Sequence, residues 1–160
     1  MESTLTKHER NISALIHAST FSKFVIPFGN FIIPLVLWTA NKNEYSYVDY
    51  NGKQALNFQI SLMLYSVVLG AISIPFLIGF FPGIFDLGFF GFDQLSNYNN
   101  FSINIDPDNF KFGTWLIPLS LAGLIKAALF IVNVVYTILA TIKTNEGQYF
   151  EYPLTIKFIK

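Results

Sequence analysis

Three side-chain amides, Gln54, Asn57 and Gln59, lie at the start of a long uncharged stretch, since no charged residue occurs from Ala55 through Phe85. Such a stretch can cross a bilayer, because about 20 residues rising about 1.5 Å each match a hydrocarbon core about 30 Å thick. Lipid cannot satisfy amide groups, so they need partners inside a membrane protein or a position at the water interface. The chemistry on offer is hydrogen bonding between helices or contact with a polar solute.

Polar residues also recur at helical spacing in two other segments. If these stripes turn inward, they hydrogen-bond across helices, and each bond contributes roughly 0.6–2 kcal/mol. The stripes comprise Ser13, His17 and Thr20; Gln54, Asn57 and Ser61; and Lys126, Asn133, Thr137 and Thr144. The candidate intramembrane polar contacts are His17, Gln54, Asn57, Gln59, Lys126 and Asn133.

Lys126 and His17 each allow two interpretations. A lysine deep in an apolar helix costs roughly 2.5–3.5 kcal/mol, so Lys126 either contacts a substrate, ion or partner or extends its ammonium group to the outer interface. His17 fits a hydrogen-bonded interior histidine better than a metal ligand, since only His8 could join it and no carboxylate cluster has metal-ligand spacing. We therefore expect no metal and no cofactor.

Four helices must position these side chains, and they are predicted over about residues 7–26, 31–40, 49 or 53–73 and 114–142. Thr6 and Glu9 form a capping-box pattern before the first helix. The predicted fold is all-α, a polytopic helical membrane protein with four membrane helices. The last two are full spans, whereas the first two are short and form a membrane hairpin or lie partly in the interface.

The predicted organisation is a single membrane domain over residues 1–160. Residues 83–113, rich in Phe and Asn, are expected to form a loop outside the membrane, and residues 147–160 a cytoplasmic tail. The β-branched and aromatic residues from Tyr152 to Ile159 favour an extended strand along the surface over a disordered tail.

Composition and charge support a membrane protein. Charged residues make up only 12% of the 160 residues, against about 25% in soluble domains, and the formal net charge of zero leaves no basic footprint for nucleic acid. Positive charge near span ends stays cytoplasmic, and the 83–113 loop contains only one lysine, Lys111. We therefore expect a multi-pass protein of the bacterial inner membrane with both termini cytoplasmic. The residues on the expected cytoplasmic side are Lys7, Arg10, Lys42, Lys53, Lys143, Lys157 and Lys160.

Four blocks of sequence, at residues 9–17, 30–38, 48–59 and 145–159, resemble the Tic-twenty-like family of small bacterial membrane proteins, a domain of unknown function (number 4870). The most specific blocks are Ala-Leu-Asn-Phe-Gln at 55–59 and Tyr-Pro-Leu-Thr-Ile at 152–156. The resemblance implies a helical inner-membrane protein, distantly related to a subunit of the chloroplast inner-envelope import translocon. It implies no catalytic residue.

These observations favour a non-enzymatic accessory or scaffold subunit of a larger membrane complex, linked by the resemblance to protein translocation. Its partners would be the lipid bilayer and other membrane protein subunits. The alternative is a small oligomeric channel or carrier, with the polar stripes of helices 1, 3 and 4 lining a path. A membrane enzyme is the least favoured class, because the sequence contains no phosphate-binding loop and no nucleophile elbow.

Overall fold

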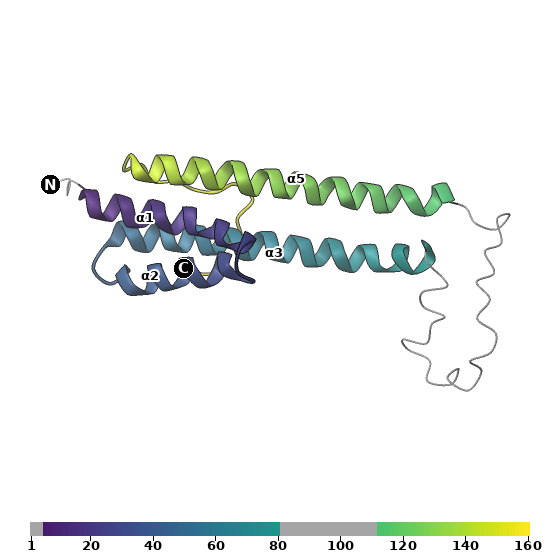
Figure 1. Ribbon diagram of the computed structural model, residues 1–160, viewed down its shortest axis with the longest axis horizontal. Coiled ribbons are helices and arrows are strands. Elements are labelled where there is room, and N and C mark those ends of the chain that lie inside the picture. The colour runs from purple at the N-terminus through teal and green to yellow at the C-terminus, as the bar shows by residue number, and fades with distance from the viewer. Residues whose placement is uncertain (1–4, 81–111) are drawn as a thin grey trace, which may run out of the picture. The chain divides into compact units, whose positions relative to one another are not determined.

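The computed structural model describes residues 5–80 and 112–160, and within these ranges every regular element is a helix. In chain order they are α1 (Lys7–Ser19), the 3-10 helix η1 (Thr20–Phe24), α2 (Gly29–Asn41), α3 (Ser46–Phe80) and α5 (Phe112–Asn145), as Figure 1 shows. The all-α prediction is confirmed for these residues. Two helices are long and apolar enough to cross a membrane, over Ser46–Ile74 and Leu119–Asn145. The predicted 83–113 loop lies outside the described residues except for its last two positions.

The helix boundaries depart from the predicted ones at the end of α1 and at both ends of α3. α1 begins at the expected capping box, in which Glu9 N donates to Thr6 Oγ1 at 3.2 Å and Thr6 N donates to Glu9 Oε2 at 2.7 Å. It ends at Ser19, earlier than predicted, because the chain tightens there into η1. α3 starts at Ser46, with Asp49 in its first turn where the helix dipole favours a carboxylate, and it continues past Pro75. Apolar helices tolerate an internal proline because the freed carbonyl finds other partners.

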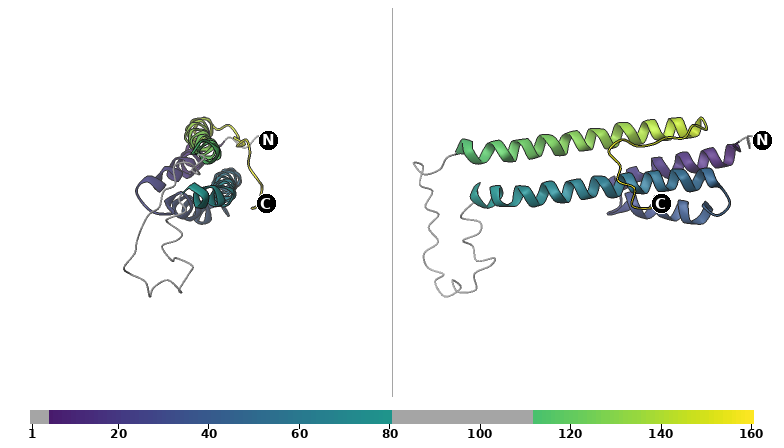
Figure 2. Two further views of the ribbon diagram at one scale, coloured as in Figure 1. Left: turned by 90° about the vertical axis from the view of Figure 1, so that its right-hand side faces the viewer. Right: turned by 180° about the vertical axis from the view of Figure 1, so that it is seen from behind.

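The chain divides into two compact units. The first contains residues 5–65 and 129–160: α1, η1, α2, the start of α3, the end of α5 and the C-terminal tail, residues 148–160, which runs extended back to α3 (Figure 2). Two apolar clusters hold this unit together. One contains Ile16, Trp38, Val48, Ala55 and Leu56, and the other contains Phe58, Leu62, Ala140, Phe150 and Tyr152.

The second unit, residues 66–128, contains in its described part the end of α3 and the start of α5. Most of the large aliphatic side chains described in this unit are exposed, including Val67, Ile72, Leu121 and Leu124. Ser73 is buried, and its hydroxyl donates to the carbonyl of Leu69 within the same helix at 2.7 Å. This surface is the type that hydrocarbon solvates better than water.

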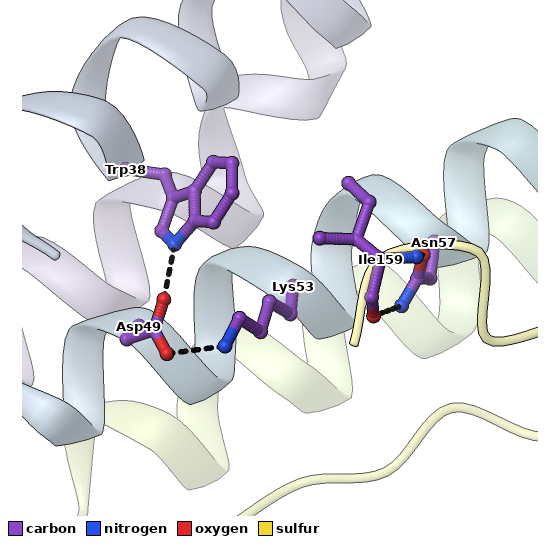
Figure 3. A network of polar contacts seen from close by, with 5 residues as sticks. All are labelled: Trp38, Asp49, Lys53, Asn57 and Ile159. Atoms are coloured by element: carbon purple, nitrogen blue, oxygen red, sulfur yellow. Dashed lines mark hydrogen bonds and ion pairs between the residues drawn. The ribbon is translucent and has the colours of Figure 1, made fainter.

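α2 packs against α3 through Trp38, which lies over Gly52. The indole Nε1 donates to Asp49 Oδ1 at 2.9 Å, and Asp49 Oδ2 pairs with the Lys53 ammonium at 2.6 Å (Figure 3). The Lys42 ammonium lies over the Trp38 ring, 4.5 Å from its centroid. A glycine is required at position 52 because a Cβ there would collide with Cδ1 of the Trp38 ring.

We expect Gly52→Ala to lower the free energy of unfolding by about 1–3 kcal/mol, the usual cost of overpacking a close helix contact. Gly70→Ala is the matched control on the same helix, since a Cβ at position 70 meets no atom within 4 Å. There alanine should stabilise the helix by up to about 1 kcal/mol. The midpoint of thermal unfolding in a mild detergent measures the stability change of each variant. A Gly52→Ala variant as stable as Gly70→Ala would contradict the close packing of Trp38 on Gly52.

Candidate functional site

Polar side chains gather in the interior of the first unit. We call this group the polar core. Side chains of this kind usually face water, so their burial needs partners. The members are Ser13, His17, Thr20, Asn51, Gln54, Asn57, Gln59, Ser61, Asn133, Thr137 and Thr144, all buried.

His17 lies at the centre of the polar core, on α1. Its Nδ1 is 2.8 Å from the Tyr152 hydroxyl, and its Nε2 is 3.1 Å from Asn51 Oδ1. The Asn51 amide nitrogen donates to the Tyr47 carbonyl at 2.8 Å, so Oδ1 is the acceptor facing both His17 and the Thr144 hydroxyl. Nε2 therefore carries the proton, and Nδ1 accepts the hydrogen bond from Tyr152.

This arrangement fits a neutral imidazole. Burial lowers the pKa of His17 from its ordinary 6.5 to about 4, and the hydrogen bond to Asn51 opposes the shift only in part. Burial likewise raises the pKa of the Tyr152 phenol. Both rings are therefore neutral near pH 7, and they serve the core as hydrogen-bonding groups.

Tyr152 anchors the C-terminal tail in this core. Its ring stacks on Phe58, with centroids 4.1 Å apart and 14° between planes, and meets the edge of Phe150 at 5.1 Å. Tyr47 holds the start of the tail, since its hydroxyl is 2.8 Å from the Gln148 carbonyl. The tail is thus fixed by aromatic contacts as well as by hydrogen bonds.

Asn57 and Ser61 of α3, with Tyr65 one turn beyond, bind the backbone of the tail. Asn57 Oδ1 accepts from the amides of Phe158 and Ile159 at 3.1 and 2.8 Å, and its Nδ2 donates to the Ile159 carbonyl at 2.9 Å (Figure 3). The amide of Ile156 donates to Ser61 Oγ at 2.8 Å. The Tyr65 hydroxyl donates to the Leu154 carbonyl at 2.8 Å. These side chains provide the hydrogen-bond partners that a neighbouring β-strand would otherwise give to an extended backbone.

We expect Asn57→Ala to release the end of the tail, because three backbone groups lose their partner together. The loss should be about 1–3 kcal/mol of stability in the tail contact. Limited proteolysis after Lys157 in detergent measures the release of the tail. Cleavage of the variant should be severalfold faster than cleavage of the wild type. Asn41→Ala is the control, since Asn41 bonds only the Leu37 carbonyl of its own helix. If both variants were cleaved at the same rate, the Asn57 side chain would not be what holds the end of the tail.

Gln59 links two helices on a different face of α3. Its Oε1 accepts from Asn30 Nδ2 at 3.1 Å, and its Nε2 faces Asn133 Oδ1 at 3.4 Å. The Thr137 hydroxyl donates to the same Asn133 oxygen at 3.3 Å. Gln59 thus joins α2 and α5 through α3.

The remaining candidates lie apart from these contacts. Gln54 is buried on α3, beside Tyr50. Lys126 belongs to the second unit and its side chain is exposed. Both interpretations of Lys126 remain predictions. Among residues 5–80 and 112–160, no group of three or more His, Cys, Asp or Glu side chains is placed to hold a metal ion.

Sequence reasoning missed Asn51 and Tyr152. Asn51 extends the stripe of Gln54 and Asn57 one turn backwards, but it lies between the two predicted helix starts, near 49 and 53, whereas α3 begins at Ser46. Tyr152 was expected to begin an extended strand along the surface, but the tail forms no strand and Tyr152 is buried. Its partner His17 is separated from it by 135 positions, and no local pattern reveals such a contact.

The family profile described as "magnetosome magnetite crystal formation protein family" matches residues 8–159. No curated protein and no solved structure matches the chain significantly. The Tic-twenty-like identification is therefore wrong. The two most specific of its four blocks, at 55–59 and 152–156, contain Phe58 and Tyr152, whose rings stack where the tail packs against α3.

Proposed function

The chain belongs to the magnetosome magnetite crystal formation protein family, and we propose that it is a non-enzymatic, membrane-embedded accessory or scaffold subunit in the formation of magnetite crystals. The earlier link to protein translocation depended on the Tic-twenty-like resemblance and is abandoned. The expected partners of the protein are lipid and other membrane proteins. Its expected locations are the bacterial inner membrane and the magnetosome that the family description names.

The observation that carries the membrane assignment is the inverted distribution of side chains in the first unit. His17, Asn57 and Thr137 are buried, whereas Leu35, Ile131 and Ile142 are among the large apolar side chains exposed on its surface. In water this arrangement would be unfavourable, because exposed apolar area costs about 25 cal/mol per Å². In a bilayer it is favourable, since lipid solvates the outside and most members of the polar core bond one another or the backbone inside, with the Ser13 hydroxyl as an exception.

Of the four membrane helices expected from the sequence, we propose that only the two predicted full spans cross the bilayer. α3 and α5 contain the two segments able to span, whereas α1 and α2 have 13 residues each, or about 20 Å, against a core of about 30 Å. With two crossings both termini remain on one side, and the lysine distribution favours the cytoplasm.

The orientation can be tested because the chain has no cysteine. In intact cells, an impermeant thiol reagent added from outside should modify Asn99→Cys and leave Glu44→Cys unmodified. The reverse result would show an inverted protein.

A structural role is also supported by what the polar stripes contact. Gln59 and Asn133 bond each other, and Asn57 is occupied by the tail. These contacts favour a packing role for the stripes over a lining for a channel, so we do not propose transport.

The function is testable in a magnetite-forming bacterium from which the resident family member has been deleted. Expression of this chain should restore crystal number and size measured by electron microscopy, and a tagged copy should co-purify with other membrane proteins. Tyr152→Ala, which removes the tail anchor, should restore less than Phe158→Ala at equal protein levels. Crystals unchanged by deletion and by expression would refute the proposal.

A further inference from the structure

The connection between α1 and α2 presents an exposed apolar surface. Phe24, Val25, Ile26 and Phe28 form what we call the hairpin tip, and Val25 is 84% exposed. The surface continues along α2 through Ile32, Leu35 and Val36. No charged residue lies between Lys23 and Lys42. A surface of this kind on a chain with two candidate spans needs a solvent other than water.

From this surface we infer that α1, η1 and α2 form a re-entrant hairpin whose tip lies in the hydrocarbon of the bilayer, with both arms starting from the same side. The inference rests on the proposed membrane embedding and adds a third membrane-inserted element to the two spans. The occupant of the apolar surface is therefore lipid acyl chains.

The backbone at the turn meets the requirement that lipid imposes. In hydrocarbon each unpaired amide or carbonyl is costly, so turns at membrane depth must satisfy their own groups. The amides of Val25 and Ile26 donate to the Ser22 carbonyl at 3.0 and 2.8 Å. Gly29 N donates to the Ile26 carbonyl at 2.9 Å. The amides of Phe31 and Ile32 donate to the Phe28 carbonyl at 3.0 and 3.1 Å. Pro27 has no amide hydrogen to satisfy.

Three polar side chains near the turn also bond inside the protein, whereas the Ser22 hydroxyl is buried without a hydrogen-bond partner among the described residues. The hydroxyls of Ser19 and Thr20 donate to the carbonyls of Ile16 and His17 at 2.7 and 2.8 Å. Asn30, which opens α2, donates to Gln59 inside the unit. Ser19, Thr20 and Asn30 therefore do not require water at the tip.

The position of the tip along α5 matches membrane depth. The Phe24 ring meets the Phe130 ring edge-on, with centroids 6.2 Å apart, and Phe130 lies near the middle of the Leu119–Asn145 candidate span. Phe130 and Ile131 are themselves exposed, so the apolar surface of the tip continues onto the span. The arms, at about 20 Å, are long enough to reach this depth and too short to cross.

Lys23 is the one charged residue adjoining the tip, and aromatic rings accommodate it. Its ammonium lies 5.1 Å from the Phe24 centroid and 5.7 Å from the Phe130 centroid, within the range of cation–π attraction. The flexible stem of lysine can in addition extend along apolar surface toward a headgroup.

Spin labels on single cysteines test the hairpin in the full chain, reconstituted in phosphatidylcholine and phosphatidylglycerol vesicles. Labels go at Val25→Cys on the tip, Glu44→Cys in the exposed turn after α2, and Val68→Cys on the outer surface of α3. We expect the ratio of oxygen to nickel-chelate accessibility to be severalfold higher at 25 and 68 than at 44. Val36→Cys on α2 repeats the measurement should Val25→Cys fail to fold.

Each other outcome has a definite meaning. A water-like label at 25 with a lipid-like label at 68 would overturn the hairpin and leave the spans intact. Water-like labels at both positions would overturn the membrane embedding itself. A label at 25 shielded from both reagents would show that protein covers the tip. A Val25→Cys thiol that reacts with an impermeant reagent from the far side would show a full crossing.

Discussion

Tyr152→Ala should lower the free energy of unfolding by about 3–5 kcal/mol, the range for truncating a buried aromatic ring. The ring is 3% exposed, stacks on Phe58 and meets the edge of Phe150. Its removal leaves a cavity and also deprives His17 Nδ1 of its partner. Thermal unfolding in a mild detergent, or titration with a denaturing detergent, measures the change.

Two further variants separate the causes of this loss. Tyr152→Phe keeps the ring and removes only the hydroxyl, so it should cost about 1–3 kcal/mol, the penalty of an unsatisfied buried polar group. Phe158→Ala, at an exposed position of the same tail, should change stability by less than about 0.5 kcal/mol. If Tyr152→Ala were as stable as Phe158→Ala, the tail would not be anchored through this ring.

Acidification should destabilise the protein through His17. The folded pKa of about 4 lies below the ordinary value of 6.5, so between these pH values the unfolded chain binds the additional proton. Stability is therefore complete above about pH 6.5 and falls as the pH decreases toward 4. At about 1.36 kcal/mol for each pKa unit, the full loss is about 3 kcal/mol.

The measurement is the unfolding midpoint in detergent at pH 7.5 and at pH 4.5. His17→Gln is the control, because its amide retains hydrogen-bonding capacity and does not titrate. The wild type should lose markedly more stability than His17→Gln over this interval. The remaining pH dependence of the variant comes from the carboxylates. Equal pH dependence of the two proteins would show that His17 is not buried in a neutral form.

Local patterns predicted most of the helical elements. The capping box at Thr6 and Glu9 appears as expected, since it depends on residues three positions apart. The two candidate spans are visible as long apolar stretches with few charges, because the ability to cross a bilayer is largely a matter of length and apolarity. The ends of α1 and α3 were less predictable, since proline and 3-10 tightening are each compatible with more than one helix end.

The grouping of Gln54, Asn57 and Ser61 on one face of α3 was also readable, and so was the different direction of Gln59. The partners were not. Asn57 was expected to bond another helix, and it holds the backbone of the tail, 102 positions away at Ile159. A backbone partner has no side-chain signature, so the sequence contains no sign of it.

By itself, the sequence determined that the regular elements of the described residues are helices, that two of them are strongly apolar, and that polar stripes on them need partners. Spacing along a helix and the free energy of transfer into lipid are local or additive properties, so they can be read without a structure. Only the tertiary structure decided that His17, Asn51 and Tyr152 meet, and that the tail completes the polar core. Such contacts depend on the path of the whole backbone, because each joins segments that no pattern of neighbouring residues connects.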